Sequence, residues 1–234
     1  MSDQQLRALE AAWRASGAVE DEAAWLLERV RVGDLAQEKL EFASYVGHQA
    51  AAAVYGLDSV DSLREWLMRL ERFGHVAVTR AGVALARVSL PAWVRRFPDD
   101  RRCLTAIEAA ESWILDSSLS LAQKAHQAGL TASTALSPRW QDYDPTPGAL
   151  AMWIASCRVA WAAGVASQSG PKGLRGKRAA EHIAEKANVE RCELAHGSER
   201  VRDRVQADLV PWALGYSDPA RERIEARQRE AARE

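Results

Sequence analysis

The stretch FPDDRRCLTAIEAAESWI, residues 97–114, is the most informative part of this chain. A proline and two aspartates lead into an alanine-rich run whose apolar residues recur every three or four positions, which predicts a helix with one buried face. Asp99 or Asp100 suits the N-cap, because a carboxylate accepts hydrogen bonds from the first free backbone N–H groups. The stretch holds no nucleophile–base pair and no set of metal ligands, so it indicates packing and recognition rather than chemistry.

The composition of the whole chain favours an all-α fold. Of its 234 residues, 47% are apolar and 27% are charged, which is ordinary for a globular protein with a buried core. Alanine dominates the apolar residues, and β-branched residues form no alternating run. Alanine has the highest helix propensity, so we expect closely packed helices. Tryptophans on apolar stripes are expected in the core: Trp66, Trp93, Trp113, Trp153 and Trp161.

Charge and cysteine usage argue against several classes of protein. The net charge of −1 gives no overall field that would attract nucleic acid or an anionic membrane. The three cysteines are far apart and odd in number, and no signal-peptide pattern opens the chain, so we expect a cytoplasmic protein with reduced thiols. The apolar run over residues 149–167 contains Arg158, which favours a buried helix over a membrane span.

Glycines and capping residues divide the chain into helices with short connections, which predicts a multi-helix bundle or an array of helical hairpins. We expect an N-terminal helical-hairpin module over residues 1–56 and an alanine- and tryptophan-rich bundle over residues 57–234. Pro91 is expected to kink or break the helix around it. A long C-terminal helix is expected over residues 177–214, and the charged tail after it is expected to fray.

Two groups of polar residues could carry chemistry, and each has a simpler interpretation. One helix carries His182, Glu185, Cys192, Glu193 and His196, but a single helix cannot bring metal ligands into one small volume. Glu108 and Glu111 fit a solvent-facing ion network better than a catalytic pair. The sequence therefore predicts no catalytic residue, no metal site and no cofactor.

Exposed loops are the best candidates for contact with a protein partner. A proline-flanked loop contains aromatic and arginine residues, the types that contribute most to interfaces. A second loop, over residues 170–178, is rich in glycine and basic residues, but it does not match the phosphate-loop spacing GxxxxGK[ST]. The predicted partner-binding residues are Arg139, Trp140, Tyr143, Asp99, Asp100, Arg101, Lys172 and Arg175.

The run ARVSLPAWVRRFPDDR, residues 86–101, followed by AIEAA at 106–110 and Trp113, resembles a pattern found in a family of bacterial immunity proteins. In that family a helix ending in an aromatic residue runs through P-x-D-x-R-P into AIEAAxxW. This chain has Arg102 and Cys103 where the family often has proline after arginine. The resemblance covers residues 75–165, and the segment over residues 13–34 resembles modules of myxobacterial proteins whose role is unknown.

The resemblance implies a helical, non-enzymatic protein that binds and neutralises a cognate bacterial toxin. It transfers no catalytic residue. Two alternatives remain open on the residues alone: a helical adaptor or regulatory scaffold for another protein, and a phosphate- or nucleic-acid-binding protein that uses the basic loop over residues 170–178.

Overall fold

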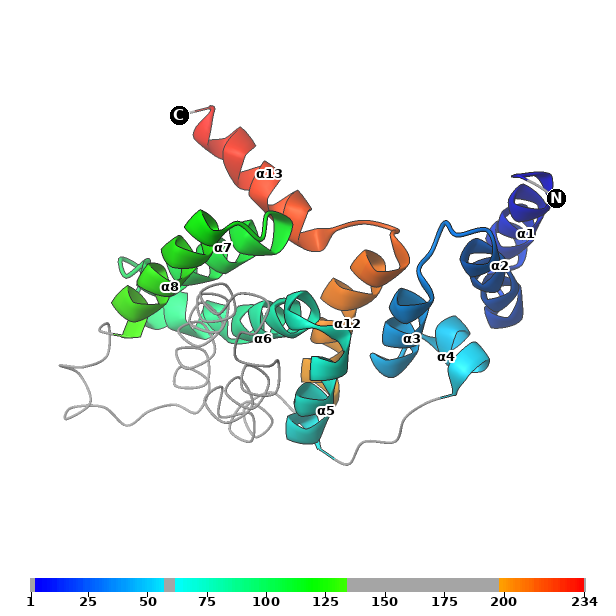
Figure 1. Cartoon of the computed structure of the whole chain (residues 1–234). Coiled ribbons are helices and arrows are strands. Elements are labelled where there is room, and N and C mark those ends of the chain that lie inside the picture. The colour runs from blue at the N-terminus through cyan, green and yellow to red at the C-terminus, as the bar shows by residue number, and fades with distance from the viewer. Residues whose placement is uncertain (1–2, 57–61, 134–197, 234) are drawn as a thin grey trace. The chain divides into compact units, whose positions relative to one another are not determined.

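The computed structural model describes residues 3–56, 62–133 and 198–233 of the chain. Within these ranges it contains ten α-helices, one short 3₁₀ helix and no strand (Figure 1). The predicted all-α, multi-helix fold is confirmed. The predicted long helix over 177–214 is described only from residue 198 onward, where α12 (Ser198–Leu214) runs to its end.

The chain forms two compact units, and each is interrupted in sequence. The N-terminal unit combines Met1–Ser59 with Leu209–Asp218, and the main unit combines Val60–Asp208 with Pro219–Glu234. The sequence predicted a single division after residue 56. The structure differs in residues 209–218, which belong with the N-terminal helices because their aromatic side chains pack there.

Four helices form most of the N-terminal unit: α1 (Asp3–Ser16), α2 (Val19–Arg31), α3 (Gln37–Tyr45) and α4 (Gln49–Tyr55). Helix α2 packs against each of the other three. The chain reverses between helices at Gly17 and Gly33, whose φ angles of +63° and +80° favour glycine. Leu26 of α2 and Leu40 of α3 are fully buried and form the centre of this unit.

His48 links the start of α4 to α2. Its Nδ1 atom accepts a hydrogen bond from the backbone N–H of Ala51 (3.3 Å), so it acts as the N-cap of α4. Its Nε2 atom lies 3.5 Å from the carboxylate of Glu22. Burial lowers the pKa of His48, and the Glu22 charge offsets this only in part. The capping contact also requires an unprotonated Nδ1 atom.

The main unit contains α5 (Leu63–Arg69), a 3₁₀ helix (Leu70–Phe73), α6 (His75–Arg96), α7 (Arg102–Leu115), α8 (Leu119–Ser133), the first part of α12, and α13 (Pro219–Ala231). Helix α7 packs against α6, α8 and α13, so it is the central helix of this unit (Figure 1). Its apolar face buries Ala106, Ile107, Ala110, Trp113 and Ile114.

Pro91 does not break its helix. Helix α6 runs without interruption from His75 to Arg96. The proline removes one backbone hydrogen bond, but Trp93, two residues later, is only 1% exposed and anchors the following turn. Trp66 and Trp113 are also buried, which confirms the predicted core positions that fall within the described residues.

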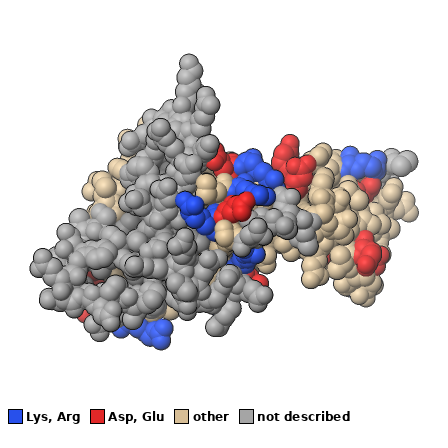
Figure 2. Space-filling model, turned by 90° about the horizontal axis from the view of Figure 1, so that it is seen from below, with Lys and Arg blue, Asp and Glu red and all other residues tan. Residues whose placement is uncertain are grey.

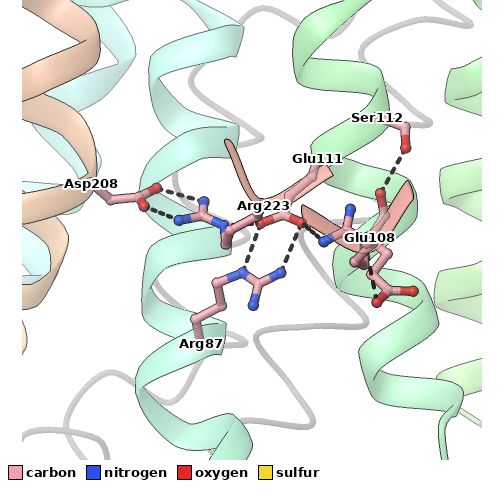
Figure 3. Close-up of polar contacts among 7 residues, drawn as sticks. Arg87, Glu108, Glu111, Ser112, Asp208 and Arg223 are labelled. Carbon is pink, nitrogen blue, oxygen red and sulfur yellow. Dashed lines mark hydrogen bonds and ion pairs between the residues drawn. The ribbon is translucent and has the colours of Figure 1, made fainter. Parts of the chain in front are cut away.

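A buried carboxylate organises the packing around α7 (Figure 3). Glu111 has no exposed side-chain surface and accepts hydrogen bonds from three arginines, on α6 and α13. The distances from its oxygens are 2.7 and 2.8 Å to Arg87, 2.6 Å to Arg223 and 2.8 Å to Arg227. Arg223 also binds Asp208, so this second carboxylate neutralises part of the positive charge.

The Glu111 cluster corrects two predictions. Glu111 was expected on a solvent face, but it lies four residues after Ile107, on the apolar side of α7, and is enclosed. The tail after residue 219 was expected to fray for want of apolar surface, but Arg223 and Arg227 tie α13 to α7 through ion pairs. Burial alone raises the pKa of Glu111, but hydrogen bonds and charges from Arg87 and the α13 arginines outweigh it and leave the pKa lowered.

Removing the buried carboxylate should destabilise the main unit far more than removing its exposed neighbour. We expect Glu111→Ala to lower the free energy of unfolding by about 3 kcal/mol, since it leaves arginines without their anionic partner. Glu108→Ala is the control, because Glu108 is partly exposed and its contact with Arg227, at 3.6 Å, is longer than those of Glu111. This substitution should lower the free energy of unfolding by about 1 kcal/mol or less. Urea denaturation followed by circular dichroism measures both, and equal losses would contradict the assignment.

The stability of the protein should fall in mild acid through His48. Because its folded pKa lies below the unfolded value of about 6.5, the folded state binds fewer protons, so stability is full above that pH and decreases as the pH falls below it. His48→Asn keeps a capping side chain and removes the titration. We expect the variant to lose less stability than the wild type between pH 7.5 and 5.5 in urea titrations. A constant difference between the two proteins at every pH would rule out this role.

Candidate functional site: a charged cavity beside the α6–α7 turn

A surface cavity of about 940 Å³ lies in the main unit where α6 turns into α7. One wall is the turn over residues 97–102, continued by Thr105 of α7. The opposite wall is α8, which contributes Lys124, Gln127, Ala128 and Thr131. The helices are held together because α7 and α8 pack along their lengths (Figure 1).

The turn has a rigid base. The ring of Trp93 packs against Phe97 with centroids 4.6 Å apart, and its indole N–H donates to the backbone oxygen of Asp100 (3.1 Å). The backbone N–H of Asp100 donates to the oxygen of Phe97 (3.1 Å). A buried tryptophan therefore fixes both ends of the turn, so the side chains at its outer surface are presented in a defined arrangement.

The carboxylate of Asp100 is occupied by hydrogen bonds within the chain. It accepts hydrogen bonds from the backbone N–H of Arg102 (3.2 Å) and from the guanidinium of the same residue (2.9 and 2.7 Å). The hydrogen bond to Asp100 raises the pKa of Arg102. Helix α7 begins at Arg102, later than the predicted start near Asp100, but Asp100 still makes a capping contact with the first helical N–H group.

Three charged side chains that line the cavity differ from the Asp100–Arg102 pair in having no partner among the described residues. Asp99, Arg101 and Lys124 are exposed, and their side chains make no hydrogen bond or ion pair with the part of the chain that the structure describes. Asp100 and Arg102, in contrast, are paired with each other. The cavity thus presents one acidic and two basic groups that are unpaired within the described ranges.

The α8 wall was not identified from the sequence. Lys124, Gln127, Ala128 and Thr131 recur at intervals of three or four residues, so they share one face of the helix. That pattern was visible as a polar stripe opposite buried Ala122, Ala125 and Ala132. Nothing in the sequence, however, indicated that the stripe faces the turn after α6.

The predicted partner-binding residues divide into two sets. Asp99, Asp100 and Arg101 lie together in the turn that lines the cavity, with Asp100 engaged internally. The others lie outside the described residues: Arg139, Trp140, Tyr143, Lys172 and Arg175. The cysteine and histidine positions considered for a metal, residues 182–196, also lie outside them.

No group of three or more potential metal ligands occurs within residues 3–56, 62–133 and 198–233. None of the helices described in these ranges has both the length and the apolar character needed to cross a bilayer. On the face seen in Figure 2, acidic and basic side chains are interspersed over the described surface, and neither sign forms a broad patch there.

Asp100 should contribute to stability and Asp99 should not, although the two are adjacent. We expect Asp100→Ala to lower the free energy of unfolding by about 1 kcal/mol, because it removes a helix-capping contact and an ion pair. Asp99→Ala should change it by less than about 0.5 kcal/mol, as for other exposed positions. Parallel denaturant titrations measure both variants. If the Asp99 variant were the less stable, the assignment of a structural role to Asp100 would be wrong.

Comparison of the chain with protein-family models, with curated protein sequences and with solved structures found no match.

Proposed function

We propose that this chain is a protein-binding protein of the immunity type, which neutralises a bacterial toxin by occupying part of its surface. The observation that supports it best is the set of exposed charges, Asp99, Arg101 and Lys124, around the 940 Å³ cavity. The turn that carries two of them, over residues 97–102, also carries the sequence pattern on which the resemblance to immunity proteins rests.

Some residues of the turn hold its backbone and others remain unpaired in the described part of the chain, and this arrangement supports recognition of a protein. Trp93 and the Asp100–Arg102 pair hold the backbone, while Asp99 and Arg101 project without partners in the described part of the chain. Rigid presentation lowers the entropy lost on binding. Charges of both signs around a cavity discriminate between partners, because a wrongly placed like charge costs several kcal/mol.

The cavity is large enough to receive several side chains of a partner segment. A volume of about 940 Å³ is at the upper end of the range for small-molecule sites. In protein interfaces, such a cavity receives an anchoring side chain whose surroundings exclude water. The charged rim would then select a partner segment that carries a basic group for Asp99 and an acidic group for Arg101.

The proposal is tested with reading frames encoded beside this gene, each expressed in a bacterial host and scored for growth arrest. Co-expression of the wild-type chain should relieve the arrest caused by its cognate toxin. The charge swap Asp99→Lys with Arg101→Glu should weaken binding to the purified toxin at least tenfold in calorimetry and abolish the relief.

The matched control is the swap Asp203→Lys with Arg204→Glu, which inverts an exposed acid and an exposed base on α12 away from the cavity. This variant should relieve arrest as well as the wild type does. Full relief by the Asp99/Arg101 variant would exclude the cavity as the binding surface. Binding of a neighbouring gene product without any relief of arrest would favour an adaptor over an immunity protein.

A further inference from the structure

We infer that helices α1–α4 form a docking surface for the end of a short helix bearing a tryptophan and a tyrosine four residues apart. Residues 209–218 of this chain occupy that surface, and a partner polypeptide with the same chemistry would bind there in their place. This surface is separate from the charged cavity, and the inference does not depend on the proposed function.

The occupying segment is the last part of α12 and the turn after it. Leu209, Ala213 and Leu214 are buried, and Trp212 and Tyr216 bear the aromatic rings. Gly215, with a φ angle of +72°, ends the helix, and the backbone N–H of Tyr216 donates to the oxygen of Pro211 (2.9 Å). This closure places Trp212 and Tyr216 so that both contact the N-terminal unit.

The tyrosine end of the segment contacts α1, α2 and the cap of α4. The Tyr216 ring lies beside those of Trp13 and Trp25, with centroids 5.8 and 6.0 Å away, and these two tryptophans stack on each other at 4.6 Å. The Tyr216 hydroxyl donates to the carboxylate of Glu22. The His48 ring meets Tyr216 edge-on, with centroids 6.5 Å apart. Shape, stacking and one hydrogen bond thus define a tyrosine site.

The tryptophan end contacts α3. The Trp212 ring packs edge-on against Phe42, with centroids 5.6 Å apart, and the ammonium of Lys39 lies 5.2 Å from its centre. Aromatic pairs and cation–π contacts of this kind stabilise by roughly 0.5–1.5 kcal/mol each beyond the area they bury. These contacts define a second site, for a tryptophan one helical turn before the tyrosine.

Between the two aromatic sites, Arg29 binds the backbone of the segment. Its Nη1 atom donates to the oxygen of Leu214 (2.6 Å), and its Nε atom is held by Asp34 (2.6 Å). The guanidinium also lies over Trp25, 4.9 Å from the ring centre. An arginine fixed on two sides and directed at a free carbonyl recognises the C-terminal end of any helix, whatever its side chains.

Two features make this a separable interaction. In the sequence, residues 60–208 separate this segment from the other helices of the N-terminal unit, so it reaches their surface as a segment tethered at a distance along the chain. One of its two aromatic anchors is also incompletely enclosed, since Tyr216 remains 39% exposed. A short helix that lays aromatic residues at i and i+4 onto a helical surface is a recurring mode of peptide recognition. The tethered copy competes with an external segment, so weakening its anchors should open the surface.

The test uses the full chain and a fluorescent peptide with the sequence of residues 207–219, ADLVPWALGYSDP, followed by anisotropy. The peptide should bind the Trp212→Ala/Tyr216→Ala chain saturably and at least about tenfold more tightly than the wild-type chain, whose own segment competes. A peptide in which both aromatic residues are alanine should bind at least tenfold more weakly. Circular dichroism verifies that the double variant remains helical.

Tyr216→Ala alone provides a test that survives misfolding of the double variant, because this side chain is partly exposed. Tyr55→Ala is its matched control: Tyr55 is a similarly exposed tyrosine of α4, at 41%. Tyr216→Ala should increase peptide binding and Tyr55→Ala should not. Absence of binding to both opened variants, or equal binding of the aromatic and alanine peptides, would overturn the inference. If gel filtration showed that the wild-type chain forms dimers and that the peptide dissociates them, the surface would bind a second copy of this chain. That result would overturn the inference of a different partner.

Discussion

The buried carboxylate of Glu111 is the interaction on which the packing of the main unit depends. It lies on the apolar face of α7 and forms ion pairs with three arginines from two other helices. One of these arginines, Arg223, also forms an ion pair with Asp208. Taking a lone carboxylate out of water is very unfavourable, so the site is stable only when the arginines are in place. This requirement makes α13, a helix with almost no apolar surface, an integral part of the unit.

The same helix supports the candidate binding site. Helix α7 begins at the turn that lines the cavity, and its buried face is secured at Glu111, about two and a half turns further on. Trp93 fixes the turn from the side of α6. The exposed Asp99 and Arg101 therefore stand on a base that is held at several points. A rigid scaffold with a charged rim is the physical basis of the proposed recognition of another protein.

The N-terminal unit is held together by aromatic and apolar contacts rather than by a buried carboxylate. Its helices pack through Leu26 and Leu40, but a segment from near the other end of the chain contributes the rings of Trp212 and Tyr216. Arg29 reaches the last carbonyl of α12, so the unit recognises a helix end and not only apolar surface. This discontinuous assembly underlies the inference that a similar external segment can take the place of residues 209–218.

The sequence by itself determined the helical fold, the division of the chain into helices at glycines, and the burial of Trp66, Trp93 and Trp113. These follow from local rules: the period of apolar residues, alanine propensity, and breaks at glycine. It also singled out the turn at Asp99–Arg101 as a candidate surface. Only the tertiary structure decided that α8 supplies the facing wall, that Glu111 is enclosed by arginines of α6 and α13, and that residues 209–218 join the N-terminal helices. Each of these depends on contacts between residues far apart in the chain, whose energies come from the burial of paired charges and aromatic rings and leave no periodic signal in the sequence.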